Sequence, residues 1–190
     1  MYSSGLSLKK TSERLLPFIK RNHVTAWNWI QKYKPTNKIL QKKKKIQEFI
    51  IIDETLIKVG NQFAWLWIAI DSINKLILGI HISFERTILV AERFLNSLIK
   101  DYGKHSLSTH DGGTWYTYAC KLLKIEHHIH STYEKSIIER TIQYIKDRTE
   151  AFDDYFPCRK DNYKLNYIKN WLKLFIDIHN KEVMNTTPVK

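Results

Sequence analysis

Runs of apolar residues divide the chain into a short helical N-terminal part and a longer part that begins with strands. The run Phe49–Ile52 is continuous and largely β-branched, which is typical of a strand buried on both faces. We place this first strand at Glu48–Asp53, with Asp53 as its last residue. Two further apolar segments, Phe63–Asp71 and Leu76–Ile82, follow short polar turns. The three segments predict an antiparallel meander.

Helical periodicity follows the meander and then alternates with short strands. An amphipathic helix is expected over residues 87–103, with Gly103 ending it. Short strands are expected at 105–111 and 124–129, and helices at 114–123, 133–152 and 163–180. The order β-β-β-α-β-α-β-α predicts an α/β domain in which helices flank a mixed five-stranded sheet.

The N-terminal part reads as two short helices joined by a turn. Ser7 and Asn22 are suitable N-cap residues, and Val24, Trp27 and Ile30 share one apolar stripe of the second helix. This pattern fits a helix-turn-helix whose second helix reads DNA, although a plain hairpin packed on the main domain would show it too. The outward residues would be of types that contact bases and phosphates, namely Thr25, Asn28, Gln31 and Lys32. A complete module has three helices, so residues 1–35 would form an incomplete one.

A basic segment separates this module from the strands. Residues 36–47 include four consecutive lysines, which suit either a solvated linker or contacts to phosphate groups. We therefore expect a linker at 36–47, a catalytic domain at 48–180 and a short tail at 181–190.

Composition narrows the class of partner. The chain has 190 residues, 43% of them hydrophobic, which is enough for one core and a small appendage. A net charge of +12 favours a polyanionic partner such as nucleic acid, although a merely basic protein would carry it as well. Two cysteines without a CxxC pair give neither a disulfide framework nor a zinc ribbon. No segment resembles a secretory signal or a membrane span, so we expect a cytoplasmic location.

Three acidic residues could form a metal site. Asp53 and Asp111 each follow a predicted strand, and adjacent strands lie about 4.8 Å apart. Two carboxylates so placed attract a hard divalent cation such as Mg²⁺ or Mn²⁺. Glu139 borders the apolar stripe of the 133–152 helix and could be a third ligand, and Lys146 lies two turns further on the same side. With 19 acidic residues in the chain, however, some such triple can always be drawn.

The residues around these acids carry a more specific signal. The motifs DETLIKV, DGGTWY and IERTIQYIKDRT occur in that order, after GLSLKKT and VTAWNWIQKY upstream. Over nearly its whole length the chain resembles the DDE transposases of compact prokaryotic insertion sequences, especially the archaeal branch. The resemblance implies a ribonuclease-H-like catalytic domain. It also implies that Asp53, Asp111 and Glu139 bind two Mg²⁺ ions, which Mn²⁺ can replace, and that Lys146 and Arg148 are the basic residues that face DNA.

The same resemblance implies a function. A transposase of this family cuts and joins DNA strands by in-line phosphoryl transfer, acting on double-stranded element ends and target DNA as a homodimer. Neither a membrane nor a small-molecule substrate is implied, and the location would be at the nucleoid. Two alternatives remain open. One is a non-catalytic DNA-binding remnant that represses transposition, and the other is a metal-dependent nuclease that cuts without joining.

Other polar residues near the motifs have simpler interpretations. Glu54 should point to the opposite side of the strand from Asp53 and serve either a structural role or a supporting role behind the metal ligands. Glu134 falls in the first turn of its helix, where a negative charge is favourable, and is a minor candidate for the site. His127, His128 and His130 could suggest zinc, but without a cysteine pair they are better explained as surface or DNA-facing residues.

Overall fold

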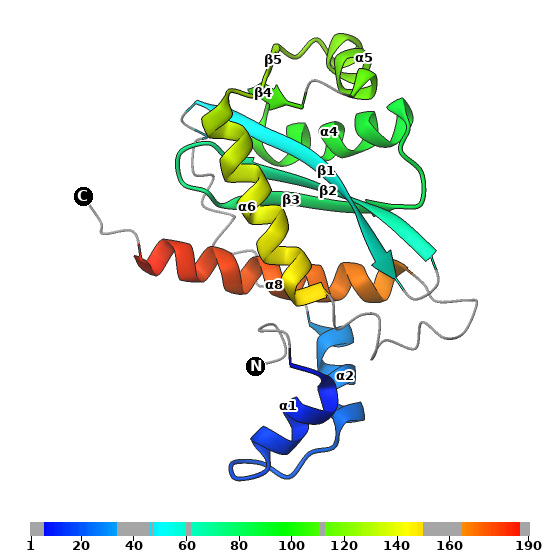
Figure 1. Ribbon diagram of the computed structural model, residues 1–190, viewed down its shortest axis with the longest axis vertical. Helices are drawn as coiled ribbons and strands as arrows, with labels where there is room; N and C mark the ends of the chain where they lie inside the picture. The colour runs from blue at the N-terminus through cyan, green and yellow to red at the C-terminus, as the bar shows by residue number, and fades with distance from the viewer. Residues whose placement is uncertain are drawn as a thin grey trace.

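The computed structural model describes residues 6–33, 46, 48–59, 62–110, 113–149 and 165–186. Within these ranges the chain forms a three-layer α/β domain, with a pair of N-terminal helices below it (Figure 1). The expected order of elements, β-β-β-α-β-α-β-α, is confirmed.

The described strands form one mixed sheet in the order β3-β2-β1-β4-β5. The first three make the expected antiparallel meander, and the last two are parallel to β1. The strands are β1 (Phe49–Val59), β2 (Gln62–Asp71), β3 (Ile77–Ser83), β4 (Ser106–Thr109) and β5 (His127–Ile129). Because β4 lies beside β1, the two strands that lead to Asp53 and Asp111 are neighbours, as a shared site requires.

The predicted end of the first strand is wrong. Asp53 lies inside β1, which continues to Val59 because the hairpin with β2 extends that far, with Asp53 opposite Ile68. The parallel pairing with β4 stops earlier, at Ile52 opposite Thr109. Asp53 is therefore the first residue of β1 after the pairing with β4 ends, so β4 no longer pairs with this edge of β1 from Asp53 onward.

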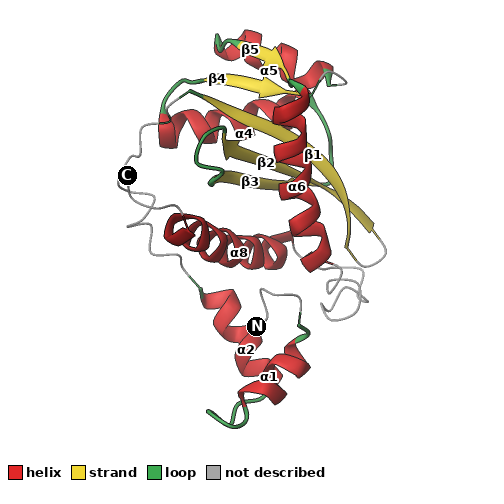
Figure 2. Ribbon diagram, turned by 60° about the vertical axis from the view of Figure 1, so that its left-hand side comes forward, coloured by secondary structure: helices red, strands yellow, loops and turns green. Residues whose placement is uncertain are grey.

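Helices cover both faces of the sheet, as Figure 2 shows. Successive side chains of β1 point to opposite faces of the sheet. Ile50 and Ile52 pack with α4 and α5, whereas Ile51 packs with α6 and α8. The helices are α4 (Ile88–Tyr102), α5 (Thr114–Leu123), α6 (Thr132–Thr149) and α8 (Leu165–Thr186). Burial on both faces explains the continuous apolar run of β1. Gly103 ends α4 with a φ of 87°, as expected.

The two N-terminal helices, α1 (Leu8–Leu15) and α2 (His23–Lys32), have the expected N-caps, Ser7 and Asn22. They form a hairpin that packs on α8, with Ala26 and Ile30 of α2 joining the main core. The predicted apolar stripe is partly wrong, because Val24 is exposed. The contact with α8 turns the buried side of α2 toward Ala26, which leaves Val24 at the margin.

The C-terminal helix is longer than expected. Instead of stopping at Asn180, α8 continues to Thr186, so the predicted end of this helix is wrong. No glycine or proline interrupts this stretch, and Lys181 pairs with Asp177 one turn earlier at 2.7 Å. The predicted linker lies outside the described residues except for Ile46, which is buried. No helix in the described ranges has both the length and the apolarity to cross a membrane.

Candidate active site

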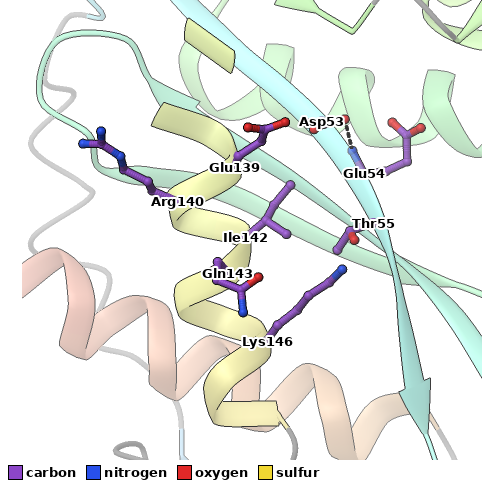
Figure 3. Close-up of a pocket in the computed structure, with 8 residues that line it drawn as sticks. All are labelled: Asp53, Glu54, Thr55, Glu139, Arg140, Ile142, Gln143 and Lys146. Atoms are coloured by element: carbon purple, nitrogen blue, oxygen red, sulfur yellow. Dashed lines mark hydrogen bonds between the residues drawn. The ribbon is translucent and has the colours of Figure 1, made fainter. Parts of the chain in front are cut away.

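A pocket of about 530 Å³ lies between β1 and α6 (Figure 3). Alternation along β1 turns Asp53 and Thr55 toward α6, and helical spacing brings one side of α6 to face them. The lining residues are Asp53, Glu54, Thr55, Glu139, Arg140, Ile142, Gln143 and Lys146. Two of the three predicted carboxylates, eighty-six residues apart in the chain (139 − 53), therefore share one pocket with the predicted lysine.

Asp53 is a largely buried carboxylate with negative neighbours. Its pKa is raised from 3.8 to about 6, first by burial and then by the negative charge of Glu54, with Glu139 adding to the effect. The Glu54 backbone N–H donates a 2.8 Å hydrogen bond to Asp53 Oδ1, which fixes the orientation of the carboxylate and partly offsets the rise. At neutral pH the Asp53 carboxylate is largely ionised, and the negative charges of its neighbours destabilise it. A bound cation would relieve this repulsion.

Glu139 faces Asp53 across the pocket. Its side chain is 58% exposed, and its carboxylate points from α6 toward Asp53 (Figure 3). Lys135, one turn earlier, lies 3.9 Å from Glu139 Oε1, a distance that makes only a weak surface ion pair. Glu139 is thus open to solvent and able to reach a ligand bound beside Asp53.

The third predicted carboxylate, Asp111, lies outside the described residues, as does Gly112. The structure does describe β4, which runs toward it parallel to β1, with Thr109 opposite Ile52. In the chain, Ile52 is directly followed by Asp53, and Thr109 is directly followed by His110. The charge of His110 lowers the pKa of Asp53, so the two side chains interact.

The two predicted basic residues of α6 differ in position. Lys146 lines the pocket and extends toward β1 near Thr55 (Figure 3). Arg148 is not among the lining residues. Its guanidinium lies 3.5 Å from the centre of the Tyr144 ring and donates a 3.0 Å hydrogen bond to the Tyr144 carbonyl. Lys146 is therefore the better placed of the two to meet a substrate in the pocket.

The candidate DNA-contacting residues of α2 differ in how exposed their side chains are. Asn28 and Lys32 are exposed and Thr25 is half-buried, with its hydroxyl bonded to Asn22 at 3.0 Å. The prediction that Gln31 faces outward is wrong. Its side-chain oxygen accepts a 3.0 Å hydrogen bond from Asn170 of α8, because α2 packs on that helix.

A polar cluster joins the start of α6 to β4 and β5. Glu134 accepts hydrogen bonds from the Ser108 hydroxyl and the Ser131 backbone N–H, and it pairs with His128 at 3.2 Å. Ser108 also contacts His130 Nδ1 at 2.6 Å. Burial alone would raise the pKa of Glu134, but these hydrogen bonds and the charge of His128 lower it below its ordinary value. The first turn of α6, and with it the position of Glu139, is thereby tied to the strand that leads to Asp111.

Comparison with known proteins identifies the chain. The sequence profile of a family described as a DDE domain, of the IS240 transposase type, matches residues 47–170. This match spans well over half of the chain and includes all three predicted carboxylates. The chain belongs to the DDE transposase family of insertion sequences.

Two relatives are similar to this chain over most of its length. The uncharacterized protein MJ0017 of Methanocaldococcus jannaschii is 31% identical over 180 residues, covering 95% of this chain and 82% of the relative. The transposase for the insertion sequence-like element IS431mec of Staphylococcus aureus is 29% identical over 160 residues, covering 80% of this chain. The match covers 66% of that transposase, so the chain spans about two thirds of its length.

The fold has solved counterparts. A chain of the simian T-cell lymphotropic virus intasome superposes with a TM-score of 0.53 at 20% identity, over 68% of this DDE-family chain and 46% of the other. A likeness at this level shows the fold. The ribonuclease-H-like mixed sheet that the motifs led us to expect is confirmed.

The carboxylates of this DDE-family chain fit a hard divalent cation. Asp53 and Glu139 offer oxygen ligands, the type that Mg²⁺ and Mn²⁺ prefer, and the repulsion at Asp53 favours a positive charge there. Among the described residues no group of three His, Cys, Asp or Glu side chains could by itself hold a metal ion. Asp111, which we expect to be the third ligand, lies outside the described residues.

One of the three histidines in this part of the chain lies in a different environment from the one that we expected. We expected His127, His128 and His130 to lie at the surface or to face DNA, yet His130 is half-buried and bonded to Ser108. Sequence reasoning missed this role because Ser108 is 22 residues away from His130. It gave Glu134 a helix-dipole role and a minor candidacy for the site, and it missed that this carboxylate joins three elements.

The buried His130 leads to a prediction about pH. Burial lowers the pKa of His130 from 6.5 to about 4, so the unfolded chain binds more protons than the folded one between these values. Stability should therefore fall as the pH drops from 7 to 5, by about 2 kcal/mol from this residue alone. His130→Gln, which cannot be protonated in this range, should flatten the pH dependence by that amount in urea denaturation. An identical pH dependence in both proteins would contradict a neutral, buried His130.

Proposed function

We propose that this chain catalyses metal-dependent cleavage and strand transfer of DNA at the ends of an insertion sequence. The observation that carries the proposal is the meeting of Asp53 and Glu139 in one pocket with Lys146 beside them. Asp111 would complete the ligand set from the end of the neighbouring strand β4. The family membership and the net charge of +12 support DNA as the substrate.

The two reaction steps require the same kind of site. In the first, a water oxygen displaces one ester oxygen at phosphorus and frees a 3′-hydroxyl at the element end. In the second, that hydroxyl attacks a phosphodiester of the target, forming one P–O bond as another breaks. Two divalent ions, when bound, would stabilise the attacking and leaving oxygens of such in-line displacements, with Mn²⁺ able to replace Mg²⁺.

The protein's own residues hold and orient the reactants. Asp53 and Glu139 approach from a rigid strand and a helix, so their carboxylates are held on opposite walls of the pocket. Lys146 would bind a non-reacting phosphate and keep the scissile bond in line. No serine or tyrosine lines this pocket within the described residues, in keeping with a direct transfer that forms no covalent protein–DNA intermediate.

Double-stranded DNA would meet the protein at two places. The pocket would take the strand to be cut, whereas the exposed Asn28 and Lys32 of α2, with Thr25, would contact the element end. We expect a homodimer on DNA, because two element ends must be held together during transfer. In a cell, such a protein would be found at the nucleoid.

The direct test uses the full chain and a plasmid that carries the gene with its genomic flanks. Incubation with Mg²⁺ should release 3′-hydroxyl ends at the element borders and produce joined products, and EDTA should prevent both. Cleavage without joining would identify a nuclease instead. Binding to the flanks without cleavage or joining would identify a non-catalytic DNA-binding protein that could act as a repressor.

Lys146 offers a prediction about DNA binding. Lys146→Ala should weaken binding to duplex DNA at every sequence and lower the slope of log K against log salt by about 1, because one phosphate contact is lost. Lys173→Ala, which removes an exposed lysine from α8 outside the pocket, is the matched control. Fluorescence anisotropy over a salt series measures both slopes. Equal slopes for Lys146→Ala and wild type would remove Lys146 from the DNA-binding surface.

A further inference from the structure

Arg86, in the loop between β3 and α4, lies between two indole rings. Its guanidinium carbon is 3.7 Å from the centre of the Trp115 ring in α5 and 4.4 Å from that of Trp65 in β2. An arginine held between two aromatic faces loses most of its freedom before it binds anything else. The guanidinium is therefore a fixed, oriented positive group on the α4 and α5 side of the sheet.

This arginine is paired with the residue that follows Asp53. Two Arg86 nitrogens, Nε and Nη2, donate to Glu54 Oε1 at 2.9 and 2.5 Å, and the Glu54 side chain is only 2% exposed. Burial raises the pKa of Tyr116 well above its ordinary value, and the Glu54 carboxylate, with which its hydroxyl interacts, raises it further. Glu54 thus connects β1 with the loop before α4, and it lies near enough to the Tyr116 hydroxyl of α5 to affect its pKa.

A glycine permits this arrangement. A Cβ added at Gly113 would lie 2.7 Å from the Trp115 ring, closer than real Cβ atoms approach another atom. The Trp115 indole can therefore fold back over Arg86 only because residue 113 has no side chain. Trp115 follows Asp111 by four residues in the sequence.

We propose that Arg86 is a positioning residue that holds Glu54, and through it Asp53, in the geometry needed for metal binding. This inference rests on the proposed function. Glu54 and Asp53 point to opposite faces of β1, and the Glu54 backbone N–H donates to Asp53 Oδ1 at 2.8 Å. Fixing the Glu54 side chain on one face therefore sets the backbone that orients the Asp53 carboxylate on the other.

Arg86 also supplies a positive charge to Glu54, the acid next to Asp53 in the chain. It pairs with the buried Glu54 carboxylate on one side of β1, whereas the Asp53 and Glu139 carboxylates face each other across the pocket on the other side. A lysine at this position would keep the positive charge but could neither stack between two rings nor donate through two nitrogens of one plane. The Arg86→Lys exchange therefore tests geometry and leaves the charge unchanged.

The experiment compares Arg86→Lys with Arg93→Lys, an exposed arginine of α4, in the full chain. The electron paramagnetic resonance signal of free Mn²⁺ gives the dissociation constant without DNA, and circular dichroism reports folding. Arg86→Lys should remain folded yet weaken Mn²⁺ binding by about tenfold, the size of effect expected when the support of a metal ligand is lost. The Mg²⁺ concentration for half-maximal strand joining should rise in parallel, with Arg93→Lys unchanged in both.

A second substitution keeps the test decisive if Arg86→Lys does not fold. Trp115→Phe retains an aromatic face for Arg86 and should weaken Mn²⁺ binding in the same direction but by less. Wild-type Mn²⁺ binding in the folded variant, within twofold, would overturn the inference. The outcome is distinguishable from failure of the proposed function. If the wild type joins no DNA but loses Mn²⁺ affinity on Arg86→Lys, the function fails and the positioning role stands.

Discussion

Asp53→Asn should abolish DNA cleavage and joining and yet make the folded protein more stable at pH 7. The activity is lost because asparagine supplies a neutral and much poorer ligand for a divalent cation. The stability rises because Asp53 has a pKa of about 6 in the folded protein and 3.8 unfolded. The folded state binds more protons between these values, so Asp53 destabilises it as the pH rises through this window, and the penalty persists at pH 7.

The gain in unfolding free energy should be on the order of 1–2 kcal/mol at pH 7 and should vanish below about pH 4. The asparagine oxygen can still accept the hydrogen bond from the Glu54 backbone N–H, so this donor keeps its partner. Urea denaturation at both pH values measures the change, and Asp101→Asn, on the exposed side of α4, is the control. A variant that is less stable than wild type at pH 7, or that still joins DNA, would contradict this account of Asp53.

Glu139→Gln should lower the rate of strand joining by about 10³-fold or more, because a direct ligand to the reacting centre is lost. Its stability should match that of the wild type, since the side chain is 58% exposed and its pair with Lys135 is long. DNA binding should be retained, because the change removes a negative charge from the pocket. Single-turnover joining with pre-cut ends isolates the chemical step.

Asp147→Asn is the matched control for Glu139→Gln. Asp147 lies on the same helix, is exposed, and is absent from the lining of the pocket. Its exchange should leave the joining rate within a few-fold of the wild type. If Glu139→Gln and Asp147→Asn behave alike, Glu139 has no special role and the proposed ligand set is wrong.

Much of this fold could be predicted from the sequence because its determinants are local. The continuous β-branched run of β1 and the apolar stripe of α6 lie within single elements, and Gly103 marks a helix end. Alternation along β1 correctly assigned the Asp53 and Glu54 side chains to opposite faces, as Figure 3 shows. These features depend on residues within a few positions of one another, which a single sequence shows directly.

The remaining features depend on contacts between distant segments. The length of β1 past Asp53 follows from pairing with β2, and the orientation of Gln31 follows from packing on α8. Arg86 contacts Glu54, which is 32 positions earlier in the chain (86 − 54), and Trp115, which is 29 positions later (115 − 86). No local periodicity in the sequence indicates these contacts. Ordered motifs around Asp53, Asp111 and Glu139 pointed to the site only through resemblance to a known family.

We propose that Asp53, Asp111 and Glu139 form one divalent-metal site, and a crystal structure of the full chain with Mn²⁺ would show this site directly. Anomalous scattering should place Mn²⁺ in the pocket between β1 and α6, bound by carboxylate oxygens of all three residues at about 2.0–2.3 Å. A saturating Mn²⁺ concentration that gives no anomalous peak beside Asp53, or a peak without Asp111 or Glu139 among its ligands, would contradict the account.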